Sequence, residues 1–281
     1  MRASQFSDIL VGHGEGPVWW PEDGLRICDG FAGRIVSIDE NGREAGSIHV
    51  GSFVGAFRPR VGGGLVAAAE RSFVLVDPGG SRRDLGELWS DTGIRMNDGG
   101  CDPQGRFYCG SMPSAGDRPV GVLYRLDTDG RVTPVLEDLS CPNGMVYSAD
   151  GQTVYYIDTP TQRVDAFDVD EAGEWQNRRV AVPNIQGGSP DGMTIDANGN
   201  LWVALWGGSG VRCFDPGTGE QLAAIEVEGA SQTSACTFGG ADLDRLYITT
   251  STDGGAGGPK AGAVFVAEPG VRGVLPAVYA G

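Results

Sequence analysis

A recurring phrase constrains the fold of this chain more than any other feature. In its clearest copy, residues 189–206, the carboxylate of Asp191 is followed by glycine, an apolar run, an Asp-Ala-Asn-Gly turn and a second apolar run. Similar phrases begin around five further positions: Glu15, Asn97 and Asn143, and, in weaker form, Val54 and Thr233. Apolar alternation with β-branched and aromatic residues predicts strands, and no segment shows a long helical period.

A second phrase alternates with the first one along the chain. It is an apolar run that ends near an acidic residue and a glycine turn, and its six copies are residues 34–42, 73–79, 122–130, 164–173, 211–217 and 263–270. Copies follow one another at roughly the 40–50 residues of a four-stranded blade. The two phrases together predict an all-β fold, a six-bladed β-propeller with four antiparallel strands per blade, in a single domain that spans residues 1–281.

The ring of blades has to close on itself. We expect residues 5–10 to supply the outer strand of the last blade, and the tail, residues 271–279, to lie beside that strand. Closure by both ends of the chain would protect the exposed strand edges.

Charge and composition exclude several classes of function. The chain has 21 Lys and Arg against 37 Asp and Glu, a net charge of −16. This balance argues against a nucleic-acid partner, whose phosphates attract Lys and Arg, and suits a soluble protein that attracts cations. No run approaches about 18 apolar residues and the N-terminus lacks an apolar signal segment, so we expect no membrane association.

The six cysteines are scattered and form no Cys-x-x-Cys pair. We interpret them as buried, reduced thiols in a reducing cytoplasm, with zinc binding or disulfides as the alternatives.

Four side chains with oxygen donors occupy the same position of the repeated unit, about ten residues before the second strand: Glu15, Asn97, Asn143 and Asp191. Because inner strands of a propeller start at one face, we expect these side chains to converge at one mouth of the channel. Carboxylate and carboxamide oxygens are hard ligands that favour a divalent cation, calcium first, with magnesium, manganese and zinc left open.

Two neighbouring roles stay open on the residues alone. Asn97 either binds the cation directly, reaches it through water, or faces a substrate. Arg95, two residues earlier, points to the same face by strand alternation and either contacts substrate or forms a structural salt bridge. The corresponding positions of the two weak copies, Val54/Gly55 and Ser234, leave the ring of donors lopsided and open on one side.

Other catalytic patterns are poorly supported. The only histidines are His13 and His49, and neither accompanies a Gly-x-Ser-x-Gly segment. There is also no phosphate-binding loop and no dinucleotide fingerprint between a strand and a helix.

These motifs together resemble the regucalcin/gluconolactonase/luciferin-regenerating-enzyme family, over nearly the whole chain. The residues that carry the resemblance are segments 14–19, 95–107, 110–112, 142–145, 190–193, 201–204, 238–242 and 279–281. The resemblance implies a six-bladed propeller with one divalent cation in its channel, and the hydrolysis of sugar lactones.

Carried over by motif, the resemblance implies that Glu15, Asn143 and Asp191 bind the cation, that Arg95 and Asn97 face the substrate, and that Asp191 is also the general base. Two departures concern the substrate. Family members that act on aldonolactones often have an acidic residue soon after the segment at 110–112, where this chain has its first carboxylate only at Asp117. Gly100 stands where a lysine is common in the family.

The sequence therefore predicts a metal-dependent lactonase whose small-molecule substrate is a sugar-type (aldono-) lactone and whose product is the open hydroxy acid. Two alternatives remain: a non-catalytic calcium-binding or regulatory protein, and an organophosphate hydrolase on the same scaffold.

Overall fold

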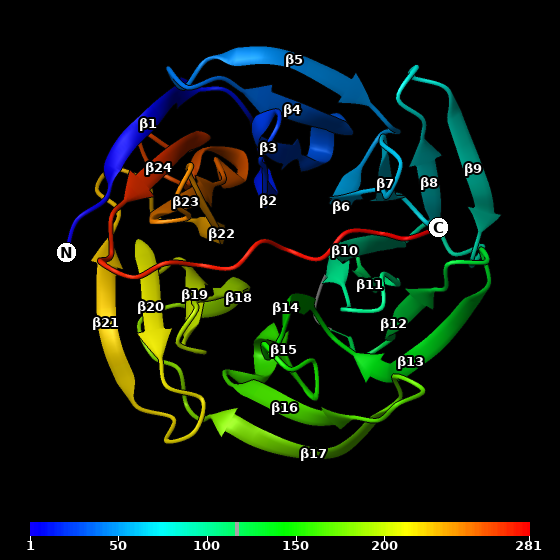
Figure 1. Cartoon of the computed structure of the whole chain (residues 1–281). Coiled ribbons are helices and arrows are strands. Elements are labelled where there is room, and N and C mark those ends of the chain that lie inside the picture. The colour runs from blue at the N-terminus through cyan, green and yellow to red at the C-terminus, as the bar shows by residue number, and fades with distance from the viewer. Residues whose placement is uncertain (116–117) are drawn as a thin grey trace.

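The computed structural model describes residues 1–115 and 118–281, whose strands form six four-stranded antiparallel sheets around a central channel (Figure 1). The predicted six-bladed β-propeller is confirmed. No α-helix occurs in the described part of the chain, which has only the short 3-10 turns η1 (Gly30–Ala32), η2 (Thr159–Thr161) and η3 (Asp253–Gly255).

Each blade places one strand at the channel and three successive strands outward. The inner strands are β2 (Gly14–Trp20), β6 (Val54–Pro59), β10 (Ile94–Cys101), β14 (Pro142–Tyr147), β18 (Ser189–Ile195) and β22 (Thr233–Gly239). The second strands are β3 (Gly24–Asp29), β7 (Leu65–Ala69), β11 (Phe107–Pro113), β15 (Thr153–Asp158), β19 (Leu201–Trp206) and β23 (Arg245–Thr250). Both strands of the first repeated phrase are therefore accounted for in all six blades.

The second phrase falls on the third strand of every blade, and the outer strand pairs with this third strand. The third strands are β4 (Arg34–Ile38), β8 (Ser72–Val76), β12 (Gly121–Leu126), β16 (Val164–Val169), β20 (Gly210–Phe214) and β24 (Ala263–Ala267). The outer strands are β5 (Glu44–His49), β9 (Arg82–Glu87), β13 (Val132–Leu139), β17 (Trp175–Val182), β21 (Gln221–Glu226) and β1 (Ser4–Ile9). We number the blades 1 to 6 from the one that begins with β2.

The acidic residues of the second phrase have a local reason to recur. Asp39 accepts hydrogen bonds from the backbone N–H groups of Asn41 (2.8 Å) and Arg43 (2.9 Å), and Asp170 does the same for Ala172 and Glu174 (2.9 Å each). A carboxylate that accepts these turn N–H groups takes the place of missing backbone acceptors. The phrase is therefore a turn signal.

Burial decreases from the channel side outward. All five residues of β8 are buried, whereas β5 is exposed except for Ile48. Apolar residues of neighbouring blades pack together, as Val18 of blade 1 does with Val54 and Phe57 of blade 2. Five of the six cysteines are buried, Cys141 is half-buried, and all six are free thiols, as the sequence predicts.

The ring closes as predicted from its N-terminal end. Strand β1 pairs antiparallel with β24, with Ser4 opposite Val266 and Ile9 opposite Ala263, so the first strand completes the last blade (Figure 1). Joining the two ends of the chain in one sheet leaves the ring without a gap between its first and last blades.

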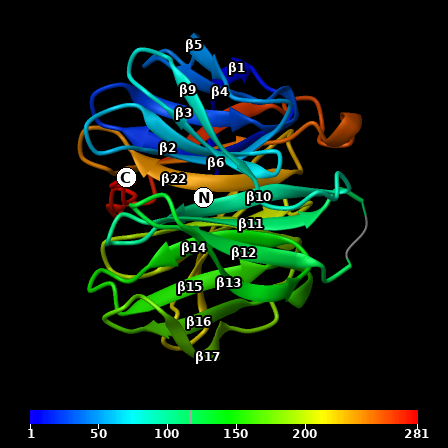
Figure 2. The ribbon, with the colours of Figure 1, turned by 90° about the vertical axis from the view of Figure 1, so that its right-hand side faces the viewer.

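The prediction for the tail was wrong. Residues 271–281 do not lie beside the closing strand but cross one mouth of the channel (Figure 1), at one face of the disc (Figure 2). The backbone N–H of Gly273 donates to Leu243 O, and the N–H of Tyr279 donates to Pro59 O, both at 2.8 Å. Leu243 lies in the turn between a first and a second strand, and Pro59 is the last residue of the first strand β6, so we call this mouth the distal mouth and the opposite one the proximal mouth.

Tyr279 fastens the tail to the far side of the ring. Its ring is 1% exposed in the apolar core of blades 2 and 3, and its hydroxyl donates to Asp127 O at 2.9 Å. Anchoring here outweighs strand pairing with β1, because a large aromatic side chain gains more from burial than an edge strand gains from a short partner.

We expect Tyr279→Ala to lower the free energy of unfolding by about 3–5 kcal/mol, since it removes a buried aromatic ring. Tyr279→Phe keeps the ring and loses one hydrogen bond, which is about 1 kcal/mol. Urea unfolding of both variants measures the difference. Equal, small losses for the two variants would contradict an anchoring role.

Candidate functional site

The inner strands share an irregularity at the position where the first repeated phrase begins. Their pairing with the second strands breaks register in all six blades: between Glu15 and Val18, Val54 and Ala56, Met96 and Gly99, Pro142 and Met145, Pro190 and Met193, and Thr233 and Cys236. A β-bulge adds a residue to one strand and redirects its side chain. Four of the bulges carry the predicted donors Glu15, Asn97, Asn143 and Asp191 at the proximal end of the channel.

The glycines of the phrase let neighbouring inner strands approach each other. A Cβ on Gly144 would lie 2.8 Å from Met193 N and 2.9 Å from Asp191 O, and one on Gly55 would lie 1.9 Å from Asn97 O. Any side chain at these positions would push the blades apart. Glycine at these positions therefore lets neighbouring inner strands pack closely where the donors lie.

Hydrogen bonds join the amides of blades 3 and 4. Arg95 Nη1 donates to Asn97 Oδ1 (2.8 Å), and Asn97 Nδ2 donates to Asn143 Oδ1 (3.1 Å). Asn143 Nδ2 in turn donates to Thr159 Oγ1 (2.7 Å), whose hydroxyl donates to Pro190 O in blade 5 (2.7 Å). Three of the predicted site residues thus form one network, oriented by Thr159, a residue that no sequence motif singles out.

Three carboxylates are buried in the channel: Glu15, Asp98 and Asp191. Burial and the charge of Asp98 raise the pKa of Glu15 to about 8. Burial, together with the charges of Glu15 and Asp98, raises the pKa of Asp191 well above its ordinary range. The charge of Glu15 in blade 1 therefore disfavours the ionisation of Asp191 in blade 5.

Asp98 and Arg58 also belong to the site, although neither was among the predicted site residues. Strand alternation turns Asp98 away from the channel if Asn97 faces it, but the bulge between Met96 and Gly99 places both residues out of regular pairing. Arg58, from blade 2, donates through Nη2 to Gly99 O (2.8 Å), and its charge opposes the burial that raises the pKa of Asp98. Asp98 could have been recognised from the sequence, because it is an acidic residue directly after Asn97 in the repeated phrase.

The donor set fits a divalent cation of the hard class. No three His, Cys, Asp or Glu side chains within residues 1–115 and 118–281 converge to hold a metal by themselves. A cation at the proximal mouth would therefore need the amide oxygen of Asn143, and that of Asn97 or water, beside the carboxylates of Glu15 and Asp191. Buried carboxylates that suppress each other's ionisation are stabilised by such a positive charge.

Arg95 is hydrogen-bonded to Asn97 of this cluster. It forms no salt bridge with any residue that the structure describes. Its guanidinium instead stands 4.4 Å from the ring centre of Phe53 and 5.8 Å from that of Phe31. Burial lowers the pKa of Arg95, and the charges of neighbouring groups, among them Glu15 and Asp191, partly oppose this lowering. A planar cation with free donors at a channel mouth suits an oxygen-rich ligand.

His13 packs at the same mouth. Its Nδ1 is 2.8 Å from Ser251 Oγ, and its ring lies 4.7 Å from Phe31 and 5.9 Å from Trp206. Burial, and next the charge of Arg95, lower its pKa to about 4. A neutral imidazole at neutral pH adds to the aromatic surface around Arg95.

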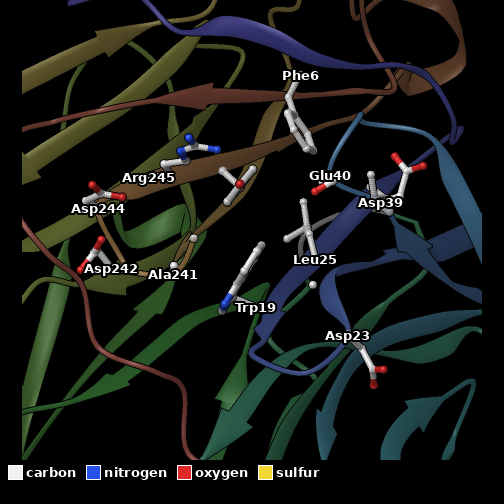
Figure 3. A pocket seen from close by; sticks show the side chains of 14 residues that line it. Phe6, Trp19, Asp23, Leu25, Asp39, Glu40, Ala241, Asp242, Asp244 and Arg245 are labelled. Carbon is white, nitrogen blue, oxygen red and sulfur yellow. The ribbon is translucent and has the colours of Figure 1, made fainter.

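Two cavities lie away from the four donors. One, of about 570 Å³, is lined by residues of blades 1 and 6 that include Trp19, Asp39 and Asp244 (Figure 3). The other, of about 350 Å³, lies in the distal part of the channel beneath the tail, with Arg58 and Leu275 among its lining residues.

Asp117, named above for the substrate, lies outside the described residues. No helix of the described chain is long and apolar enough to cross a membrane.

We expect His13 in metal-free protein to titrate with a pKa near 4. Its unfolded value is about 6.5, so the folded state binds fewer protons between these values, and stability present above pH 6.5 is lost as the pH falls toward 4. The NMR shifts of the His13 imidazole measure the titration. A pKa near 6.5 for His13 would contradict the packing described.

Known proteins similar to this chain can now be compared with its geometry. Human regucalcin is 34% identical over 284 residues, which cover 95% of each chain, and the pentonolactonase XacC of Haloferax volcanii is 37% identical over 279 residues, 94% of each chain. Among solved structures, a calcium-binding protein, regucalcin, from Agrobacterium tumefaciens superposes with a TM-score of 0.90 at 27% identity, covering 99% of this chain and 97% of that one.

A luciferin-regenerating enzyme superposes with a TM-score of 0.86 at 27% identity and covers 96% of both chains. The family model described as the SMP-30/Gluconolactonase/LRE-like region matches residues 13–252, a range that holds all of the predicted site residues. This chain belongs to the SMP-30/gluconolactonase/luciferin-regenerating-enzyme family.

Proposed function

We propose that this protein is a metal-dependent lactonase that opens a sugar-type (aldono-) lactone to the hydroxy acid. The observation that supports the proposal most is the hydrogen-bonded Asn97–Asn143 pair beside Arg95, which forms no salt bridge with any described residue, in a channel where the charge of Glu15 helps to raise the pKa of Asp191. Relatives named as a pentonolactonase and a gluconolactonase support the reaction.

Glu15, Asn143 and Asp191 would hold the cation, with Asn97 as a further ligand or a substrate contact. Calcium suits their hard oxygens, as the calcium-binding regucalcin structure also suggests, and zinc, magnesium and manganese accept the same donors. When bound, the cation would supply Lewis-acid polarisation of the lactone carbonyl and neutralise the charge that develops on its oxygen.

Asp191 would remove a proton from the attacking water. Its burial, with Glu15 and Asp98 nearby, otherwise favours the protonated form, so the base function depends on the positive charge held between these carboxylates. Arg95 and Asn97 would orient the lactone by donating to its ring oxygen or hydroxyls, and their mutual hydrogen bond fixes both side chains beforehand.

A second candidate is a non-catalytic calcium-binding protein, which the name of the regucalcin relatives favours. Both candidates need the same cation ligands and differ in whether a substrate is turned over. For either, we propose a single propeller domain over residues 1–281 and a reducing cytoplasm, in which the six free thiols would persist.

Asp191→Asn should lower kcat for a pentono-γ-lactone by about 10²–10⁴-fold, because an amide cannot accept the proton of water. Asp244→Asn, an exposed carboxylate of the cavity in Figure 3, is the matched control and should keep full activity. Acid release in a pH-indicator assay, with and without chelator, measures both. Unchanged, chelator-resistant turnover in Asp191→Asn would refute the metal dependence and the role of Asp191 in the proposal, and cation binding without any turnover would favour the calcium-binding protein.

Cation binding should release protons at pH 7. Glu15, whose pKa lies at about 8, is mostly protonated in the metal-free protein and has to lose its proton to bind. Affinity for calcium should therefore rise as the pH increases from 6 to 8. Calorimetric titration in buffers of different ionisation enthalpy counts the protons. An affinity independent of pH, with no proton release, would place the cation elsewhere.

A further inference from the structure

Phe31 is a large aromatic side chain that the fold leaves uncovered. It exposes 66% of its surface although it stands in η1, at the proximal face of blade 1. Its position is fixed by packing: the ring lies 4.7 Å from His13 and 5.5 Å from Phe53. A Cβ on the preceding Gly30 would lie only 2.6 Å from His13 Cδ2, so the turn sits tightly against the histidine.

The exposed ring belongs to a chain of aromatic side chains in contact at the proximal mouth, which we call the aromatic wall: Phe31, the buried Phe53, and the half-buried His13 and Trp206. Arg95 joins this wall to the site. Its guanidinium lies over Phe53 and Phe31, while its Nη1 donates to Asn97 Oδ1 at 2.8 Å. A molecule held by Arg95 and Asn97 is therefore next to the wall.

An aromatic face discriminates between the two sides of a sugar-like ring. A C–H or alkyl surface placed on Phe31 removes apolar area from water on both partners, which is favourable. A hydroxyl in the same place loses its hydrogen bonds to water and finds no acceptor on the ring, which costs free energy. The wall thus favours one chemical class of ring substituent.

We propose that Phe31 is a specificity-determining residue, whose ring packs against the non-polar face of the bound lactone. The preferred substrates are lactones that carry hydrogen or alkyl groups on that face and keep their oxygens toward Arg95 and Asn97. This inference rests on the proposed lactonase function and adds the substrate class to it.

The first test compares a pentono-γ-lactone with its 2,3-dideoxy counterpart. Phe31→Ala should lower kcat/KM for the dideoxy lactone about tenfold, the discrimination expected of one apolar contact, through KM and with little change in kcat. The loss for the hydroxylated lactone should be several times smaller, so the ratio of the two kcat/KM values falls. Phe31→Leu, which keeps an apolar surface, should retain most of the preference.

Leu222→Ala is the matched control, because Leu222 is 53% exposed on the outer strand β21. It should leave both kcat/KM values unchanged. Equal losses on the two lactones in Phe31→Ala, or no loss on either, would overturn the inference even if the wild-type protein is an active lactonase.

A binding measurement separates this inference from the reaction. The probes are 5-methyl-2-pyrrolidinone, a γ-lactam whose ring carbonyl stands in for that of the lactone, and its 3,4-dihydroxy derivative. Each is titrated by calorimetry into calcium-loaded protein. Tighter binding of the first lactam, weakened about tenfold by Phe31→Ala and not by Leu222→Ala, supports the wall whether or not lactones are hydrolysed. Equal effects of Phe31→Ala on both lactams, or failure of the wild type to bind either, would refute it.

Discussion

The repulsion between buried carboxylates is the constraint on which the proximal mouth depends. Glu15, Asp98 and Asp191 come from three different blades, and burial raises the pKa of each. The charge of Asp98 raises the pKa of Glu15 further, and the charges of Glu15 and Asp98 raise that of Asp191. A fold that only needed stability would place apolar side chains there. Arg95 and Arg58 offset part of the negative charge, and a divalent cation is the natural complement for the rest.

The propeller converts a repeated local motif into this convergence. Each inner strand has a bulge at the same position, which turns one side chain inward, and in blades 1, 4 and 5 a glycine directly after the donor lets the strands approach. Blades 2 and 6 repeat the backbone motif without contributing a donor. In blade 6 the hydroxyl of Ser234 instead donates to Gly14 O at 2.5 Å. The donor ring is lopsided for this reason, and Arg95 and the aromatic wall border its open side.

The two mouths of the channel differ in what covers them. The tail crosses the distal mouth and is held there by backbone hydrogen bonds at Gly273 and by the buried ring of Tyr279. Val274 and Leu275 lie over the distal cavity. Access to the buried carboxylates is therefore expected from the proximal mouth, where Phe31 stands exposed.

Periodic features of this protein could be predicted from its sequence, and features that break the period could not. The turn signals and strand alternation repeat in every blade, which gave the blade count, the strand order and the closing role of residues 5–10. Asp98 was missed because the bulge at Met96–Gly99 breaks alternation. Arg58 was missed because it comes from a blade whose phrase has no donor, and its guanidinium reaches Gly99 of the next blade.

The tail and Phe31 show a second limit. Nothing local distinguishes a tail that pairs with an edge strand from one that crosses a channel, since the outcome depends on where the core accepts Tyr279. Phe31 reads as an ordinary apolar residue in a turn, and only its exposure beside Arg95 gives it significance. Long-range packing decides both features.

The most direct test of the central claim is the position of the cation itself. Crystals grown with manganese in place of calcium locate the ion by its anomalous scattering. The account predicts one strong peak at the proximal mouth, within coordination distance of carboxylate oxygens of Glu15 and Asp191 and of the Asn143 amide oxygen. A proximal mouth without a peak in ion-saturated crystals, or a single peak among the acidic residues of the cavity in Figure 3, would contradict it.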